Sequence, residues 1–376
     1  MRIYYIITLI FLSGIAHAQI VNIPDANFKT ALLNHSPVID TNGDGEIQVS
    51  EAEVVLKLHL EHKQIASLEG VQNFINLEDL NCHGNALTIL DISQNQNLKK
   101  LRCSWNQLTN LDISQNLNLE SLVVYHNELT DIDVSEHFYL EVLSVSNNPL
   151  TVLDVTNNPN LKNLSCNDAQ LTSLDVSQNL NLTSLGISDN DFTNIDLSNN
   201  SRLISLGCSR TQLTNLDLSD NPSLFTLTCT SNSTLITLNI KNGNNINMPY
   251  MDAEFNPNLQ CIEVDDVTVA NARHCYRGDP MVGWCKDATA IYSEDCVLGV
   301  AEVSKDTFNL YPNPTNGILN IQTTYNPDLI KIYSIQDILV KETQESSVDV
   351  SNLASGLYFV KVSTQGKSII KKFIKY

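Results

Sequence analysis

The sequence predicts a mainly β protein: a leucine-rich solenoid of short stacked coils, with a small helical N-terminal cap before it and a C-terminal antiparallel β-sandwich after it. The solenoid is indicated by a leucine that recurs every 21 residues, and the sandwich by short alternating apolar runs in residues 308–376. Eight leucines begin the repeats: Leu77, Leu98, Leu119, Leu140, Leu161, Leu182, Leu203 and Leu224.

Each repeat has the same internal apolar pattern. Leucine also stands at position four, and a small or branched apolar residue stands at position six. This alternation has the period of a β-strand with one buried face. A single unit of 21 residues cannot bury its apolar side, whereas stacked units share one continuous core. We therefore expect parallel coils about 4.8 Å apart, with the leucines inside.

Asparagine recurs at positions nine and nineteen. Its side chain can donate and accept hydrogen bonds, so it can pair with backbone groups left over in the tight turns of a coil. We expect both columns to be structural. The members at position nine are Asn85, Asn106, Asn127, Asn148, Asn190 and Asn232, and those at position nineteen are Asn95, Asn116, Asn158, Asn179, Asn200 and Asn221, with His137 as the exception.

Two further columns each allow two interpretations. The aspartates at position fifteen are expected to accept N–H groups in local turns, and metal ions bridging successive coils are the alternative. The cysteines at position six are expected to be free thiols that fill the core rather than disulfides. These residues are Asp91, Asp112, Asp133, Asp154, Asp175, Asp196 and Asp217, and Cys82, Cys103, Cys166, Cys208 and Cys229.

The repeat, close to LxxLxCxxNxLTxLDxSxN, resembles the leucine-rich repeat superfamily, in particular its short bacterial, internalin-like members. The resemblance covers residues 64–258. It implies a curved solenoid whose short parallel strands line a concave, ligand-binding face. The unit after Leu224 is degenerate and residues 241–247 are rich in asparagine, so we expect the solenoid to end in this region.

Residues 1–18 have the pattern of a secretory signal peptide. Arg2 precedes an apolar run from Ile3 to Ile15, and Ala16-His17-Ala18 forms a small-residue cleavage site. The run is too short to span a membrane, and an uncleaved anchor is the alternative. We expect a mature chain that begins at Gln19, has no transmembrane segment, and is exported to an oxidising compartment.

Residues 19–63 are expected to form an N-terminal cap that contains a calcium loop at residues 40–51. A helix is predicted from Asp25 to Leu33. The loop resembles the EF-hand and dockerin type, which implies a structural Ca²⁺ ion, although a strand-like run rather than a long helix follows it. An acidic turn without an ion is the alternative. The expected oxygen donors are Asp40, Asn42, Asp44, Glu46 through its carbonyl, Gln48 and Glu51.

Four cysteines outside the repeat indicate a C-terminal cap at residues 259–296. An even number of cysteines in an exported chain is typical of disulfides, and three pairings are possible. We favour the nested one, Cys261–Cys296 outside Cys275–Cys285. A zinc site that includes His274 is the alternative, although no short C-x₂-C spacing supports it.

Residues 297–307 are expected to be a linker, and residues 308–376 a separate domain. Short alternating runs between Pro, Asn and Gly turns predict a small antiparallel sandwich. The segment resembles the C-terminal sorting domain of type IX secretion in its YPNP-x-NG opening, its Leu353–Val362 motif and its basic end. The resemblance implies contact with that secretion machinery and a location outside the outer membrane, secreted or on the cell surface. An ordinary adhesive β-sandwich is the alternative.

Charge and motifs exclude several function classes. The net charge of −20 argues against binding to nucleic acid or to an anionic membrane surface. The sequence has no phosphate-binding loop, no H-E-x-x-H motif and no dinucleotide fingerprint. We therefore expect a protein that is not an enzyme. An accessory solenoid of an exported hydrolase and a passive surface-layer component are the alternatives.

One part of the strand face differs from the Ser, Thr, Asn and Gly that dominate the rest. The second and third repeats place an arginine and three aromatic or imidazole side chains at outward positions. Such a cluster is typical of interface hot spots and of sugar-stacking surfaces, and scattered surface aromatics are the alternative. We expect an extracellular protein or glycan to bind here. The residues are Arg102, Trp105, Val123, Tyr125 and His126.

Overall fold

The computed structural model describes residues 19–275, 282–296, 308–323, 327–335, 338–364 and 367–376. The chain forms two compact units, Met1–Cys296 and Val297–Tyr376. The predicted signal peptide and linker lie outside the described residues. Among the described residues, no helix has the length and apolar character needed to cross a membrane.

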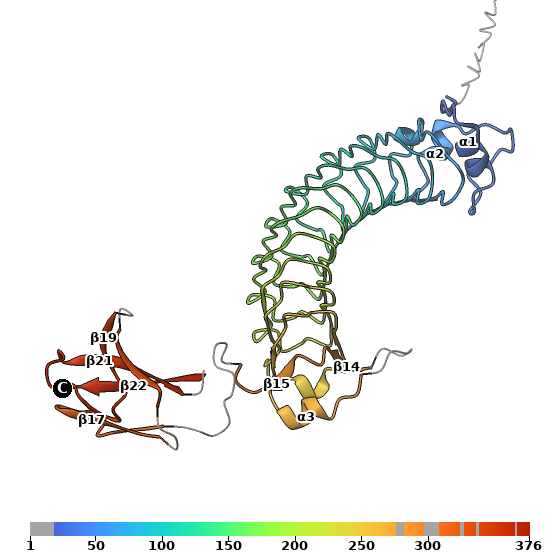
Figure 1. The fold of residues 1–376 in the computed structure, drawn as a ribbon. Coiled ribbons are helices and arrows are strands. Elements are labelled where there is room, and N and C mark those ends of the chain that lie inside the picture. Colours follow the sequence, from blue (N-terminus) through green and yellow to red (C-terminus); the bar gives the residue numbers. More distant parts are fainter. Residues whose placement is uncertain (1–18, 276–281, 297–307, 324–326, 336–337, 365–366) are drawn as a thin grey trace, which may run out of the picture. The chain divides into compact units, whose positions relative to one another are not determined.

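The first unit is a curved stack of coils, and a parallel sheet of 11 strands runs along its inner side (Figure 1). The strands follow the order of the chain, with β9, β11 and β13 in a different sheet. The members of the long sheet are β1 (Lys57–His59), β2 (Asp79–Asn81), β3 (Lys100–Arg102), β4 (Ser121–Val123), β5 (Val142–Ser144), β6 (Asn163–Ser165), β7 (Ser184–Gly186), β8 (Ser205–Gly207), β10 (Thr226–Thr228), β12 (Tyr250–Ala253) and β14 (Gly283–Lys286).

The leucines at position four share one register across the sheet. Leu80 pairs with Leu101, which pairs with Leu122, and each is fully buried. All eight leucines of this column are at most 1% exposed. Burial of one such side chain contributes about 1.5–3 kcal/mol, so the column is a main source of the free energy of folding. The predicted solenoid of stacked coils is confirmed.

The stack continues past the last regular repeat. Met251 pairs with Leu227, and Trp284 pairs with Met251, so two other apolar side chains extend the leucine column. A second parallel sheet covers another side of these last coils. It has the order β15 (Ile291–Ser293), β13 (Cys261–Glu263), β11 (Thr237–Asn239) and β9 (Asn215–Asp217). The coils therefore reach into the residues expected to form only a cap.

The N-terminal end of the stack is covered by α1 (Ala26–Leu33) and α2 (Val49–Ala52). Phe28 and Leu32 of α1 are fully buried in the same core as the coils. Asp25 caps α1, since its Oδ1 accepts N–H groups of Asn27 and Phe28, each at 2.9 Å. Its Oδ2 accepts the N–H groups of Ala66 and Ser67 and so ties the helix to the first coil.

Short helical turns complete the stack: η1 (Val71–Asn73), η2 (Asn245–Asn247) and α3 (Val267–Asn271). The structure forms the nested disulfides, with Cys261–Cys296 outside Cys275–Cys285. The five cysteines at position six are buried free thiols, as predicted.

The second unit is the expected antiparallel sandwich. One sheet has the order β16 (Asn309–Tyr311), β17 (Ile318–Gln322) and β20 (Ser347–Asp349). The other has the order β19 (Leu339–Thr343), β18 (Leu329–Ser334), β21 (Gly356–Thr364) and β22 (Lys367–Lys375). Phe308, Leu319, Ile330, Val360 and Phe373 lie in a separate apolar core.

Candidate functional site

The residue at position eight, just after every strand of the long sheet except β14, has a left-handed backbone. Trp105, His126, Arg210 and Phe255 all have φ between 51° and 61° there, and Gly84 has φ 68°. Residues other than glycine seldom adopt this conformation, and bulky ones least of all. The turn therefore holds large side chains at a fixed place along the edge of the inner sheet.

Five rings at positions seven and eight form one connected group, which we call the ring cluster: His62, His83, Trp105, Tyr125 and His126. The centroids of the Trp105 and His126 rings are 3.9 Å apart, and those of Tyr125 and His126 are 5.7 Å apart. His83 is 6.1 Å from Tyr125 and 4.9 Å from His62. Contacts at these distances stabilise a defined arrangement of the rings.

The ring cluster encloses one serine. Ser104 occupies position seven between His83 and Tyr125, and it is fully buried without a hydrogen-bond partner for its Oγ among the described residues. On later coils the side chain at position seven accepts the backbone N–H of the residue at position seven on the following coil. Ser188 Oγ, for example, accepts the N–H of Ser209 at 3.0 Å. The rings have thus replaced a regular polar column with an aromatic surface.

Polar pairs border the cluster on the adjacent strands. Arg102 Nη1 lies 3.2 Å from Asp79 Oδ1, and Asn81 Nδ2 donates to Glu61 Oε1 at 2.5 Å. Each pair joins two successive coils, so the planar end groups have fixed orientations.

All five predicted ligand-binding residues lie in this region. Trp105, Tyr125 and His126 belong to the ring cluster, Arg102 ends β3, and the partly exposed Val123 ends β4. The prediction missed His62 and His83. His83 stands at position seven of the regular repeat that begins at Leu77, so comparison of the outward positions of all repeats could have found it. His62 precedes that repeat and could have been found by extending the repeat towards the N-terminus.

His83 has a pKa below its ordinary value. Burial lowers the pKa of His83, and the neighbouring His62 lowers it further. His83 is therefore mostly neutral at pH 7, and protonation in acid would place a positive charge beside His62.

The predicted calcium loop is a compact set of oxygen donors. Asp40 accepts the N–H groups of Gly43 at 2.7 Å and Gly45 at 3.0 Å, and both glycines have the positive φ that such a turn requires. Asn42 Nδ2 lies 3.0 Å from both Asp44 Oδ2 and Gln48 Oε1. The side chains thus converge. The side-chain and carbonyl oxygens of this loop are the kind of ligand atom that a hard cation such as Ca²⁺ prefers.

Glu51 closes the loop from α2. Its Oε1 accepts the N–H and Oγ1–H of Thr41, each at 2.7 Å, and its Oε2 accepts the N–H of Gln48 at 3.1 Å. Burial raises the pKa of Glu51, but these hydrogen bonds outweigh it and the pKa lies below its ordinary value. The pKa of Asp44 is also lowered, chiefly by the N–H of Glu46. Both carboxylates are therefore ionised at neutral pH.

The sixth expected donor, Glu46, directs its side chain away from the loop. Its Oε1 lies 2.6 Å from Lys29 Nζ of α1, which leaves its carbonyl as the group available to an ion. A segment near the start of the described chain pairs with the loop, since Val21 N–H donates to the Ile47 carbonyl and Val49 N–H to the Gln19 carbonyl, both at 2.8 Å. No second loop of this kind packs against it among the described residues, and this backbone pairing holds the loop against the cap.

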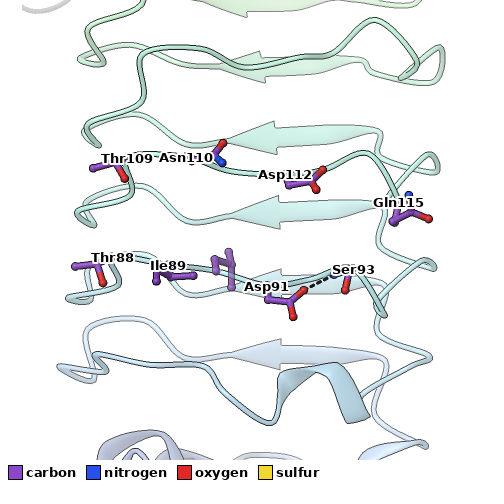
Figure 2. A pocket seen from close by; sticks show the side chains of 9 residues that line it. Thr88, Ile89, Asp91, Ser93, Thr109, Asn110, Asp112 and Gln115 are labelled. Atoms are coloured by element: carbon purple, nitrogen blue, oxygen red, sulfur yellow. Dashed lines mark hydrogen bonds between the residues drawn. The ribbon is translucent and has the colours of Figure 1, made fainter.

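The aspartates at position fifteen form local turns, as predicted. Asp91 Oδ1 accepts the N–H of Ser93 at 3.0 Å, and Asp112 Oδ1 accepts that of Ser114 at 2.9 Å. These bonds lower the pKa of both carboxyl groups. Figure 2 shows the two aspartates on successive coils, in a shallow depression of about 330 Å³ that also contains Ile89. These local bonds account for the recurrence of aspartate at position fifteen.

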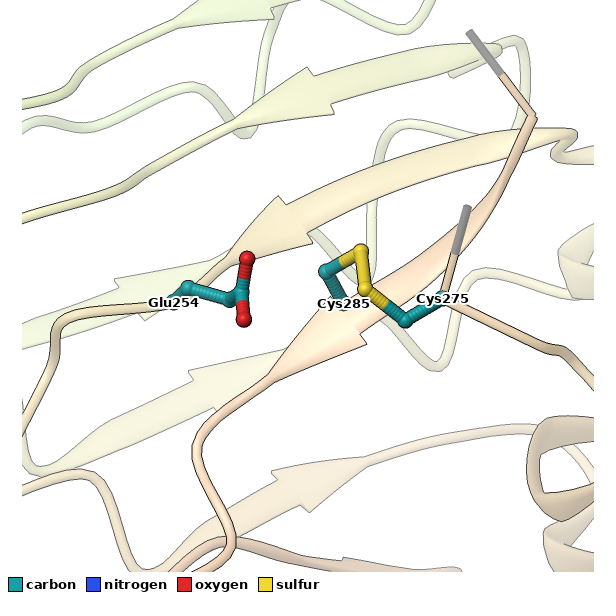
Figure 3. Close-up of side chains that lie close together, drawn as sticks. All are labelled: Glu254, Cys275 and Cys285. Carbon is teal, nitrogen blue, oxygen red and sulfur yellow. A yellow bond between two sulfur atoms is a disulfide. The ribbon is translucent and has the colours of Figure 1, made fainter. Parts of the chain in front are cut away.

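One further group of metal-ligand atoms lies at the C-terminal end of the stack. The Glu254 carboxylate and the sulfurs of Cys275 and Cys285 lie within 4.8 Å of one another (Figure 3). The two sulfurs are bonded to each other, so neither is available as a thiolate ligand. The group is therefore a disulfide beside a carboxylate rather than the zinc site considered from the sequence.

Comparison with known families identifies the second unit. Residues 309–376 match the family described as the secretion system C-terminal sorting domain. A chain with this tail is exported, to the cell surface or beyond. Comparison with curated protein sequences finds no match.

Solved structures similar to this chain include bacterial leucine-rich repeat proteins. The functional domain of InlJ from Listeria monocytogenes, whose description mentions a cysteine ladder, is 20% identical, with 95% of this chain and 98% of that chain covered and a TM-score of 0.49. An internalin from the same organism is 22% identical over 65% of this chain and 85% of that chain, with a TM-score of 0.47. A Leptospira interrogans leucine-rich repeat protein is 28% identical over 44% and 45%, with a TM-score of 0.42.

Proposed function

We propose that this chain is an exported recognition or adhesion protein that binds an extracellular partner on the inner sheet of its solenoid, without catalysing a reaction. The observation that carries the proposal is the ring cluster. Trp105 is 53% exposed, whereas the later coils carry mostly small polar side chains on this face. Exposed Trp, Tyr and Arg side chains held in fixed orientations are the residues that contribute most to binding at interfaces.

The remainder of the molecule supports this function mechanically. The stack joins its coils into one apolar core, so the inner sheet is rigid and its surface is preorganised for binding. The sorting domain provides export, and contact of that domain with the type IX secretion machinery is part of the proposal.

We further propose that the loop at residues 40–51 binds one Ca²⁺ ion with a structural role. Asp40, Asn42, Asp44, Gln48 and Glu51 would supply side-chain oxygens, and Glu46 its carbonyl. The ion would hold the cap on the exposed end of the stack, because the loop leads directly into α2 and then β1. Loops of this kind in extracellular modules bind Ca²⁺ with dissociation constants on the order of 10⁻⁴–10⁻³ M.

The binding function can be tested with the double variant Trp105→Ala, Tyr125→Ala and the control Phe255→Ala. Phe255 is an ideal control because it is 66% exposed and stands at the same left-handed position of a distant coil. Immobilised extracellular proteins and polysaccharides serve as probes. We expect the double variant to bind at least about tenfold more weakly, and the control to bind like the wild type.

Thermal unfolding separates binding from stability in the same experiment. We expect Phe255→Ala to unfold within about 0.5 kcal/mol of the wild type, and the double variant to lose no more than about 1–3 kcal/mol, the size expected from its ring contacts. Unchanged binding by the double variant, or a large loss of its stability, would contradict the proposal.

A further inference from the structure

From the ring cluster we infer that the partner is a neutral glycan. This inference rests on the proposed function and names the class of ligand for the same surface. Sugar rings present C–H groups on their faces and hydroxyls at their edges. A matching site needs an accessible aromatic face surrounded by planar hydrogen-bonding groups with fixed orientations.

Trp105 supplies the aromatic face. His126 covers it from the next coil, with the ring centroids 3.9 Å apart. On the preceding coil the same position is occupied by Gly84, which has no side chain, and a Cβ there would lie 2.3 Å from His62 Nδ1. Trp105 therefore has a ring neighbour on the C-terminal side, and on the N-terminal side the space beside Gly84 is filled by His62. The Trp105 side chain is still 53% exposed, so part of the indole is accessible for stacking of a flat ligand.

The planar groups are Arg102 with Asp79 and Asn81 with Glu61. The two members of each pair hold one another, at 3.2 Å and 2.5 Å respectively. Asp79 and Glu61 keep further lone pairs as acceptors, and Arg102 keeps further N–H donors. Neighbouring hydroxyls of a sugar both donate and accept hydrogen bonds. A side-chain pair that contains a donor and an acceptor can therefore bind them without a change in side-chain conformation.

The charges of this surface indicate that the glycan is neutral. The whole chain carries a net charge of −20, and charges of both signs lie beside the cluster. Arg102 binds Asp79 at 3.2 Å, and the exposed Lys57 and Lys100 flank Asp79 in the sheet. Uronate or sulfate groups would meet carboxylates as well as cations here, and the net negative charge of the chain would repel them.

The surroundings favour a glycan over a protein. The central part of a protein interface is depleted of charge and rich in apolar side chains. Here the only aliphatic side chain next to the rings at an outward strand position of β2–β4 is Val123. On β5 to β8, position five carries Ser144, Ser165, Gly186 and Gly207, and Val142 is the one aliphatic side chain at an outward strand position.

The test uses the full-length chain and isothermal titration calorimetry. The neutral probes are cellohexaose, chitohexaose, mannohexaose and laminarihexaose, and the anionic probes are oligogalacturonate and chondroitin sulfate. We expect heat with at least one neutral probe, a loss of affinity of at least about tenfold in Trp105→Ala, partial recovery in Trp105→Phe, and no change in Phe255→Ala. Asp79→Asn, which keeps the shape but loses the ion pair, should weaken binding severalfold.

Three outcomes would overturn the inference. They are binding of anionic probes alone, binding of neutral probes that Trp105→Ala leaves unchanged, and absence of glycan binding by a chain that binds a purified protein. In the last case, loss of protein binding in the Trp105→Ala, Tyr125→Ala variant would leave the proposed function intact. The two proposals can therefore fail separately.

Discussion

The ring of Trp105 lies against the ring of His126 on the following coil, with centroids 3.9 Å apart and an interplanar angle of 31°. Both residues have left-handed backbones, so the contact depends on a conformation that most side chains avoid. Farther along the same column, Asn147 Nδ2 donates to Asp168 Oδ2 at 2.8 Å, and Arg210 pairs with Asp189. Contacts between successive coils at position eight thus change from aromatic to polar along the sheet.

Removal of the Glu51 carboxylate should weaken calcium binding strongly. We expect Glu51→Gln to weaken Ca²⁺ binding by at least about tenfold in calorimetry, because the loop loses the residue that can bind the ion with two oxygens. Glu53→Gln, a change just outside the loop, is the matched control and should bind like the wild type. With 10 mM Ca²⁺ and a dissociation constant near 10⁻⁴ M, the wild type should gain about 2.7 kcal/mol. No heat from the wild type would contradict the calcium proposal.

Acid should destabilise the coil that contains His137. This residue takes the place of asparagine at position nineteen, is 2% exposed, and has its Nε2 3.2 Å from the Ile113 carbonyl. Burial lowers its pKa, so the folded chain binds fewer protons there than the unfolded chain does. The stabilisation is present above the unfolded pKa, about 6.5, and is lost as the pH falls below it towards the folded pKa.

Urea unfolding at pH 7 and pH 5 measures this effect. His137→Asn restores the residue found in the rest of the column, so it should lose less stability between these pH values than the wild type does. An identical pH dependence for the two proteins would show that His137 is not the titrating group.

The buried asparagine column should contribute strongly to stability. Asn158 Nδ2 donates to the carbonyls of Val134 at 2.9 Å and His137 at 3.0 Å, and the residue is fully buried. Asn158→Ala leaves two buried acceptors unpaired and should cost about 2 kcal/mol in urea unfolding. Asn160→Ala removes a similar bond to Phe138 on the surface and should cost less than about 0.5 kcal/mol. Equal effects would mean that burial does not determine the contribution.

The thiols at position six should be unreactive in the folded chain. Burial raises the pKa of Cys103, Cys166 and Cys208 to about 12, so at pH 8 roughly one part in ten thousand is thiolate. We expect N-ethylmaleimide to modify none of the five free cysteines at pH 8, and all five after unfolding in guanidinium. Rapid labelling of the native chain, followed by mass spectrometry, would show that the column is exposed.

The sequence predicts the coils well because each repeat places the same buried and turn-forming residues at the same positions. Leucines spaced by 21 residues must share a core, and the asparagine and aspartate columns follow from turns that recur in every coil. The same reasoning fails where the spacing changes. Met251 and Trp284 continue the leucine column, but they follow Leu227 and Met251 at intervals of 24 and 33 residues, so a fixed period does not find them.

The candidate site was predicted only in part for a similar reason. Outward positions of regular repeats led to Trp105, Tyr125 and His126, whereas His62 lies before the regular repeats and His83 was overlooked in the first of them. The left-handed backbone at position eight was also not predicted, because no single residue type recurs at this position. Glycine appears at only one of them, Gly84, and the side chains range from serine to tryptophan.

Photo-crosslinking tests the central claim most directly, because it reports which part of the sheet touches the partner. The variant Tyr125→p-benzoylphenylalanine places the crosslinker in the ring cluster, and Phe255→p-benzoylphenylalanine places it at the far end of the same sheet. We predict a covalent adduct with a bound partner from position 125 and none from position 255. Adducts from position 255 alone, or from both positions equally, would contradict recognition by the ring cluster.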